Sequence, residues 1–317
     1  MSANISFLKA FLRPVTFFCF FISFVLVITF SCSKKTPDIP IAMVPERLTL
    51  SAVNESVLIG GTTGFIIKYF NGLGVEAPVP GGIVWSVGNP AIATVDQQGI
   101  ATGVSAGQTE VMVTYKTITA KALLNVVAND TQIAVVEIEP DIIELLLAGS
   151  ATLTAVVKNI NGDIIPGKTI QWETDSVEYA DINATSGQVT AKGYGTAHIT
   201  ATADGIKSSP AIVQIIRRGD FSGMNSSGTA KLKIESGVLK LQTTSAFLVS
   251  AGPPDLRIYL GNNDNNIDGA VEIASLPDRS GAQDWNLPAS VKMLDYRYVI
   301  VWCKQFGGTY GVADLGQ

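Results

Sequence analysis

The sequence predicts an all-β protein made of two tandem β-sandwiches and a third, β-rich domain. Short runs rich in Val, Ile and Thr alternate with turn residues, and the 317 residues include 30 Gly and 14 Pro. A long segment recurs at offsets of 88, 87 and 88 residues, an interval that suits a tandem domain rather than a solenoid repeat. Residues 220–317 show no convincing amphipathic helical pattern.

Composition and charge exclude several classes of function. The net charge is −5 and Lys and Arg form no large cluster, which argues against a nucleic-acid partner. His198 is the single histidine, so a His-rich metal site, an HExxH protease and bis-histidine haem ligation are excluded. Three cysteines are too few for a disulfide scaffold.

Residues 1–31 are predicted to be a targeting segment. Lys9 and Arg13 precede an uncharged apolar run over residues 15–30. That run is about 16 residues long, shorter than the roughly 20 that span a bilayer and suited to a signal peptide. The segment is therefore expected to be absent from the mature protein.

The end of this segment resembles a bacterial lipoprotein signal, because the run closes in Thr-Phe-Ser-Cys at residues 29–32. The resemblance implies cleavage before Cys32 and attachment of lipid to its thiol and new amino group. Ser33 stands where an inner-membrane retention signal would place Asp, which favours the outer membrane. Thr29 and Phe30 depart from the commonest pattern, and an uncleaved anchor or ordinary secretory signal is the alternative.

Cleavage would simplify the chemistry of the mature chain. Removing Lys9 and Arg13 changes the formal charge from −5 to −7. Cys19 would leave with the signal and Cys32 would carry lipid, so Cys303 would be the only free thiol. Residues 32–43, with two prolines, are expected to form a short extended tether.

Residues 44–128 and 132–216 are predicted to be two copies of one β unit. Asn161-Gly162 and Asp204-Gly205 supply the positive φ angles that tight hairpins need. About seven short runs per copy favour an antiparallel sandwich. The matched positions are Gly61 with Gly149, Trp85 with Trp172, and Gly107 with Gly195.

The first copy carries a specific signature: VWSVGNPAIATVD at residues 84–96 and GIATG at 99–103. It resembles the bacterial immunoglobulin-like group-two domain, found in intimin-like surface proteins. The second copy keeps IQWET at 170–174 and GQVTA at 187–191 but lacks the Asn-Pro step. The resemblance implies two Ig-like sandwiches. Each Trp is expected to fill the core between its sheets, since no disulfide is available there.

Two other patterns in these copies are not expected to be functional. Residues 103–107 fit G-x-S-x-G, but a nucleophile elbow needs a strand–turn–helix and a nearby histidine. This segment is predicted to be a loop between strands. His198 alternates with Ala197 and Ile199, which predicts a solvent-facing position on a strand.

Residues 219–317 are predicted to form the third domain, with β runs at 229–234, 238–241, 255–260, 271–274 and 298–306. Their motifs are DFSG at 220–223, SGTA at 227–230, GPPDLRIYL at 252–260, GAQDWNLP at 281–288, YRYVIVWCKQF at 296–306 and YGVADL at 310–315. This order resembles the DM-thirteen domain, also called the electron-transfer DM domain. Pro253-Pro254 and Trp285 depart from the usual pattern.

The resemblance implies a redox role centred on the cysteine of a W-C step, here Cys303. That cysteine would act as a bare thiol or as a ligand to a prosthetic group such as haem. Lys304 is adjacent, but strand alternation points it to the opposite face. The alternative is a buried cysteine that packs as a small apolar residue.

The stretch 262–269 is the most polar part of this domain. Asp264, Asn266 and Asp268, followed by Gly269, match the first half of a calcium loop. The final Glu of an EF-hand would fall at Ser275, so that version fails. Two interpretations of residues 262–269 remain: a site that binds calcium in another geometry, or a simple Asn/Asp-rich turn.

Two functions follow from these patterns. In the first, a lipid-anchored envelope protein uses an Ig-like stalk to present a redox or electron-transfer domain centred on Cys303, with an envelope redox partner. In the second, the chain is a non-catalytic adhesion or binding protein for a surface ligand, and Cys303 is structural. No self-contained acid–base site is visible, so an enzyme is not expected. Lipid on Cys32 would make the membrane a partner in both cases.

Overall fold

The computed structural model describes residues 44–223, 225–250 and 252–316, and every regular element within them is a strand. The predicted signal segment, Cys32 and the tether lie outside these ranges. None of the described residues belongs to a helix long and apolar enough to cross a membrane. The prediction of an all-β chain is confirmed.

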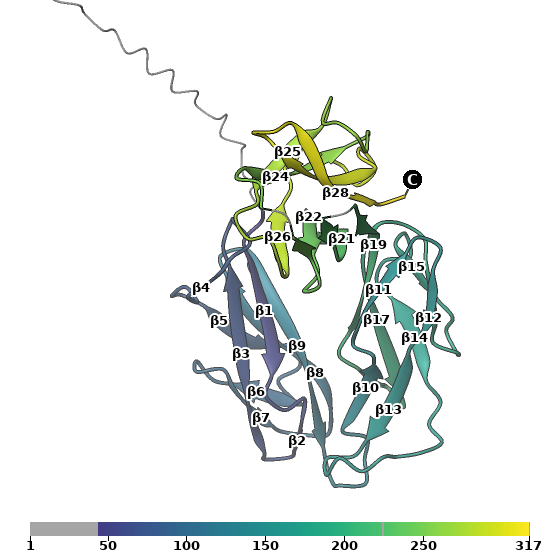
Figure 1. Ribbon diagram of the computed structural model, residues 1–317. Coiled ribbons are helices and arrows are strands. Elements are labelled where there is room, and N and C mark those ends of the chain that lie inside the picture. The colour runs from purple at the N-terminus through teal and green to yellow at the C-terminus, as the bar shows by residue number, and fades with distance from the viewer. Residues whose placement is uncertain (1–43, 224, 251, 317) are drawn as a thin grey trace, which may run out of the picture. The chain divides into compact units, whose positions relative to one another are not determined.

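The first repeat copy folds into two facing sheets (Figure 1). One sheet has the order β1-β3-β7-β6, with β4 beside β3, and the other has the order β2-β9-β8-β5. The strands are β1 (Arg47–Ala52), β2 (Ser56–Leu58), β3 (Thr62–Phe70), β4 (Glu76–Ala77), β5 (Val84–Val87), β6 (Ala93–Val95), β7 (Ile100–Gly103), β8 (Gly107–Tyr115) and β9 (Ile118–Val127).

The second copy repeats this pairing. β11 runs parallel to β19 as β2 runs parallel to β9, and β17 lies between β19 and β14 as β8 lies between β9 and β5. The strands are β10 (Val135–Glu139), β11 (Ile142–Leu146), β12 (Ser150–Thr152), β13 (Thr154–Lys158), β14 (Gln171–Thr174), β15 (Ala180–Ile182), β16 (Gln188–Ala191), β17 (Gly195–Ala203), β18 (Ile206–Lys207) and β19 (Ala211–Ser222).

Each sandwich core contains a tryptophan that packs beside a glycine. Trp85 and Trp172 are buried, as predicted, and Trp85 lies 6.1 Å from the ring of Phe65 in the opposite sheet. Gly99 has φ +79°, and a Cβ there would lie 2.4 Å from Cζ2 of Trp85. Gly187 has φ +71°, and its Cβ would lie 2.9 Å from Cε2 of Trp172. Both copies thus need a residue without a side chain where the indole covers the turn.

The two patterns set aside in the sequence have structural roles. Ser105 lies in the turn between β7 and β8, and its Oγ donates a 2.6 Å hydrogen bond to the carbonyl of Ala91. No helix follows it, so this is not a nucleophile elbow. His198 is exposed on β17, as predicted, with Nδ1 2.7 Å from Oδ2 of Asp175.

β19 serves both the second sandwich and the third domain. Its residues up to Ile216 pair with β11 and β17, whereas Arg217 to Asp220 pair with β21 and the last two residues pair with β28. The boundary expected between residues 216 and 219 therefore falls inside one continuous strand (Figure 1).

The third domain has a sheet path β25-β24-β27-β28-β19-β21-β22-β26, with β20 pairing β23. Leu241 of β22 and Ile258 of β24 belong to one buried cluster that forms the core. The strands are β20 (Ser226–Ser227), β21 (Thr229–Glu235), β22 (Val238–Thr243), β23 (Leu248–Val249), β24 (Leu256–Gly261), β25 (Val271–Ser275), β26 (Gln283–Asn286), β27 (Tyr298–Cys303) and β28 (Gly308–Asp314).

Candidate functional site

Cys303 is the last residue of β27 and is wholly enclosed. Its exposed fraction is 0%, and it pairs with Leu256 of β24 on one side and Gly308 of β28 on the other. It belongs to the apolar core cluster of the domain. The strand expected to continue to residue 306 ends here, in a turn at 304–307. A thiol in this position packs as a small apolar group and is not accessible to a second molecule.

A charged network lies beside the end of β27. Nζ of Lys304 is 3.0 Å from Oε2 of Glu272, which also accepts a 2.9 Å hydrogen bond from the hydroxyl of Tyr259. Arg257 contacts the other oxygen of Glu272 at 3.1 Å. Burial by itself raises the pKa of Glu272, but the hydrogen bonds from Lys304 and Tyr259 outweigh it, so the pKa lies below its ordinary value. Glu272 is consequently an ionised anchor between β24 and β25.

The calcium-like stretch forms an exposed connection between β24 and β25. Its oxygens take part in local hydrogen bonds: Oδ1 of Asn266 accepts from the amide of Asp268 at 3.0 Å, and Oδ1 of Asp264 accepts from Asn265 at 2.7 Å. Within the described ranges no three His, Cys, Asp or Glu side chains are grouped to hold a metal. Calcium at Asp264, Asn266 and Asp268 therefore stays a prediction.

Asp264 instead borders a polar cavity of about 510 Å³ in the third domain. β19, β27 and β28 meet there, and three of the motifs recognised in the sequence contribute to its walls. Among its lining residues are Asp220, Ser222, Asp264, Tyr298, Tyr310 and Asp314. Sequence analysis singled out the motifs but did not bring them together.

Two of the cavity carboxylates are already paired. Oδ1 of Asp220 lies 3.3 Å from Arg218 and accepts a 2.6 Å hydrogen bond from Thr229, and these contacts, Thr229 first, lower its pKa. Asp314 accepts two hydrogen bonds from Arg297, at 3.0 and 2.7 Å, and this fork lowers the pKa of Asp314. These contacts keep both acids ionised, and both side chains remain partly exposed.

A β-bulge directs Tyr310 toward this cavity. Val301 pairs with Gly311 and Trp302 pairs with Thr309, which leaves Tyr310 as the extra residue of β28. A Cβ on Gly311 would lie 2.0 Å from Oγ of Ser226, so only glycine fits beside this bulge.

Arg217 is a buried charged residue of the third domain that sequence analysis missed. It is 3% exposed, and its Nη1 donates to the carbonyls of Met293 at 2.6 Å and Tyr296 at 2.8 Å. Nη2 also donates to the carbonyl of Gly316. Burial lowers the pKa of Arg217. Strand alternation places Arg217 on the same face of β19 as the buried Phe221, and this was the sequence signal from which the burial of Arg217 could have been predicted.

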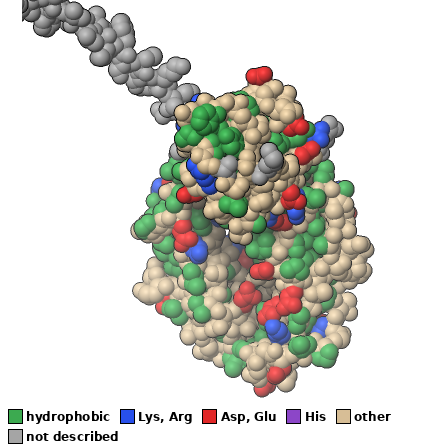
Figure 2. All heavy atoms as spheres, viewed as in Figure 1, with side chains coloured by type: hydrophobic (Ala, Val, Ile, Leu, Met, Phe, Trp, Pro, Cys, Tyr) green, Lys and Arg blue, Asp and Glu red, His purple; other side chains and the backbone are tan. Residues whose placement is uncertain are grey.

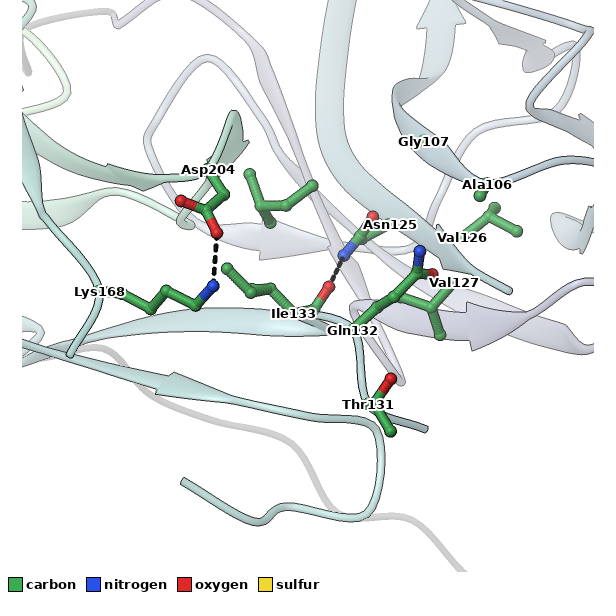
Figure 3. Close-up of a pocket in the computed structure, with 11 residues that line it drawn as sticks. Ala106, Gly107, Asn125, Val126, Val127, Thr131, Gln132, Ile133, Lys168 and Asp204 are labelled. Atoms are coloured by element: carbon green, nitrogen blue, oxygen red, sulfur yellow. Dashed lines mark hydrogen bonds and ion pairs between the residues drawn. The ribbon is translucent and has the colours of Figure 1, made fainter. Parts of the chain in front are cut away.

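Another cavity, of about 460 Å³, surrounds the connection between the two Ig-like copies. Buried Asn125 donates hydrogen bonds to the carbonyls of Ile133 at 2.8 Å and Ala134 at 2.9 Å. Figure 3 shows the first of these, together with the 2.6 Å ion pair between Lys168 and Asp204. A single ion pair supplies the charged lining of this cavity, which therefore offers no catalytic constellation.

Comparison with family models identifies two domains in the chain. The model described as "Electron transfer DM13" matches residues 221–315, and the model described as "Bacterial Ig-like domain (group 2)" matches residues 77–126. The chain therefore contains an electron-transfer DM13 domain and a bacterial Ig-like group-two domain, and the two resemblances are confirmed over these residues. No curated protein matches the chain.

Several solved structures match the chain, with low sequence identity and low TM-scores. Domains 4 and 5 of the S-layer protein SbsC share 18% identity, with 55% of this chain and 99% of that chain covered and a TM-score of 0.24. The Escherichia coli adhesin FdeC shares 16% identity, with coverages of 88% and 99% and a TM-score of 0.24. A fragment of intimin shares 16%, with coverages of 53% and 65% and a TM-score of 0.22.

Proposed function

We propose that this chain is a lipid-anchored cell-envelope protein in which Ig-like sandwiches carry a DM13 domain with a redox role centred on Cys303. The observation that carries the proposal is the match of the electron-transfer DM13 model to residues 221–315, which contain the Trp302-Cys303 step. The Ig-like copies serve as spacers, since neither contains a convergent set of reactive groups.

The surroundings of Cys303 decide which form of redox chemistry fits. Haem needs open space at its ligand, and Cys303 has none, because its exposed fraction is 0% and apolar residues of the core enclose it. The residues present do not fit a haem. The redox role that we propose for Cys303 is therefore exchange of its thiol with a disulfide. This exchange requires transient opening of the turn at 304–307.

The test uses the full chain carrying Cys19→Ser and Cys32→Ser, so that Cys303 is its one cysteine. We expect this thiol to react with the aromatic disulfide DTNB by local opening. The thiolate would attack one sulfur of the reagent, form a mixed disulfide and release the other half as a thiolate, with the Cys303 proton going to solvent. The measurement is the rate of that release against the rate of global unfolding. Release of the reagent's thiolate faster than global unfolding supports the redox proposal. The Cys303→Ala variant should show no such release.

Release only at the rate of global unfolding would contradict the thiol form. An absorbance spectrum recorded with haem offered supplies the other check. A Soret band that shifts with dithionite and is lost in Cys303→Ala would show that our exclusion of haem is wrong. Failure of both tests would leave the adhesion or binding alternative, in which Cys303 only packs.

Anchoring through Cys32 has its own test. Cells that express the chain and are fed a radiolabelled fatty acid should label the protein, and Cys32→Ser should remove the label and release the protein from the membrane fraction. Cys19→Ser is the matched control, because Cys19 lies within the segment proposed to be cleaved, and it should leave labelling unchanged. Equal labelling of both variants would exclude lipidation at Cys32.

The proposed partners are the outer membrane, through the lipid, and an envelope disulfide or thiol. A nucleic acid is not among them. The net charge is −5, and on the face shown in Figure 2 the Lys and Arg side chains are scattered among Asp and Glu rather than gathered in a basic patch. The binding alternative is favoured by one specific feature, the polar cavity bordered by Asp264 and Tyr310.

A further inference from the structure

Most of the cavity bordered by Asp264 and Tyr310 is lined by residues of paired strands, and Asp264 and Asn265 come from the exposed connection between β24 and β25. Tyr298 and Asp314 are cross-strand partners on β27 and β28, and Ser222 of β19 pairs with Val312 of β28. Tyr310 is partly exposed and packs in part against the apolar core. The volume of the cavity, about 510 Å³, lies within the range of roughly 300–1,000 Å³ that small-molecule sites occupy.

The charges around the cavity restrict the ligand. An anion would meet three carboxylates. A cation would find Asp220 and Asp314 already paired with Arg218 and Arg297, and of the three acids only Asp264 has no ion pair among the described residues. Ionised carboxylates, whether or not they are ion-paired, accept hydrogen bonds from hydroxyl groups. The lining therefore suits a neutral ligand rich in hydroxyl groups.

The remaining lining groups agree with such a ligand. The ring of Tyr310 is partly exposed and offers an apolar surface with a hydroxyl tip. The ring of Tyr298 is also partly exposed and carries the guanidinium of Arg297 at 5.1 Å from its centroid. Oγ1 of Thr309, another lining residue, is buried and has no hydrogen-bond partner. An aromatic ring beside carboxylate acceptors complements the apolar faces and hydroxyl edges of a sugar ring.

We propose that this cavity of the DM13 domain binds a neutral saccharide, with Asp264 and Tyr310 as its principal contacts. The site lies on residues other than Cys303 and does not depend on redox activity. The inference gives the adhesion alternative a ligand class, but it holds equally if the domain transfers electrons. Saccharide binding by Cys303→Ala separates the two proposals, because that variant should bind as the parent chain does.

The test is isothermal titration calorimetry of the full chain in a detergent without sugar headgroups, with EDTA present. The probes are maltotetraose, mannotetraose and N-acetylchitotetraose. We expect at least one to bind, and we expect Asp264→Asn to weaken that binding about tenfold, the scale of one hydrogen bond to a charged group. Tyr310→Ala should weaken it at least as much, and Tyr310→Phe, which keeps the ring, should weaken it less.

Asp268→Asn is the matched control, because Asp268 lies in the same exposed loop and is not among the residues that line the cavity. It should bind within twofold of the parent chain. Absence of binding by all three probes, or equal binding by the parent, Asp264→Asn and Tyr310→Ala, would overturn the proposal. Binding that appears only when calcium replaces EDTA, and that both Asp variants abolish, would overturn it in favour of a calcium loop.

Discussion

Replacing Arg217 with Ala should destabilise the third domain by about 3–5 kcal/mol, since the change removes a buried charged donor and leaves carbonyl groups unpaired. Those carbonyls belong to Met293, Tyr296 and Gly316, which lie far from Arg217 in the sequence. Hydrogen–deuterium exchange of peptides over residues 287–297 and 308–316 is the measurement. A loss of about 3 kcal/mol would raise their exchange rates by roughly 100-fold or more.

Arg218→Ala is the matched control for that experiment. Arg218 is the next residue of β19, and its side chain is exposed and pairs only loosely with Asp220. Exposed ion pairs contribute little to stability, so exchange should change little. Arg217→Lys should recover only part of the loss, because one ammonium cannot reproduce the fork of a guanidinium. Equal effects of the Arg217→Ala and Arg218→Ala changes would contradict the assignment of Arg217 as a clamp.

Replacing Trp172 with Ala should destabilise the second sandwich by about 3–5 kcal/mol, the usual cost of removing a large aromatic side chain from a core. Trp172 is 5% exposed, and its indole covers the turn at Gly187. No disulfide reinforces this core, since Cys303 is the only cysteine that the structure describes. Hydrogen–deuterium exchange of the amides of β17, which pairs with β14, should accelerate in line with this loss of stability. Exchange of the β8 amides in the first sandwich should be unchanged.

Gln171→Ala provides the comparison on the same strand. Gln171 faces solvent beside Trp172 on β14, so its loss removes no core contact and should leave exchange near that of the parent. If Trp172→Ala left β17 exchange unchanged, another group would have to hold the two sheets together, and the role given to the repeated tryptophan would be wrong.

The repeat could be predicted because its determinants are local in sequence. Turn residues, alternation and the matched Gly and Trp positions recur in both copies, and each has a direct physical meaning. Trp85 with Gly99 and Trp172 with Gly187 occupy the same relation in the structure. Alternation also predicted β21, β22, β24, β25 and β27 of the third domain, although β27 ends at Cys303 rather than at residue 306. It did not predict β20, β23, β26 or β28.

The candidate site was only partly predictable. The sequence marked Cys303 and left open whether its thiol was accessible, because alternation assigns a face of a strand without telling how that face is covered. Lys304 next to it faces outward and is held by Glu272. Asp264 was marked as a metal ligand, yet the structure places it against a cavity whose other walls come from β19 and β28.

The sequence alone thus determined the all-β class, the duplication, a core Trp in each copy and the presence of the DM13 motifs, since each depends on residues close together in the chain. Only the tertiary structure decided that β19 joins the second sandwich to the third domain, that Cys303 is enclosed, that Arg217 is a buried clamp and that Asp264 and Tyr310 share a cavity. The reason is that these features depend on which strands pair, and strand pairing joins segments far apart in sequence whose alternation patterns are compatible with many partners.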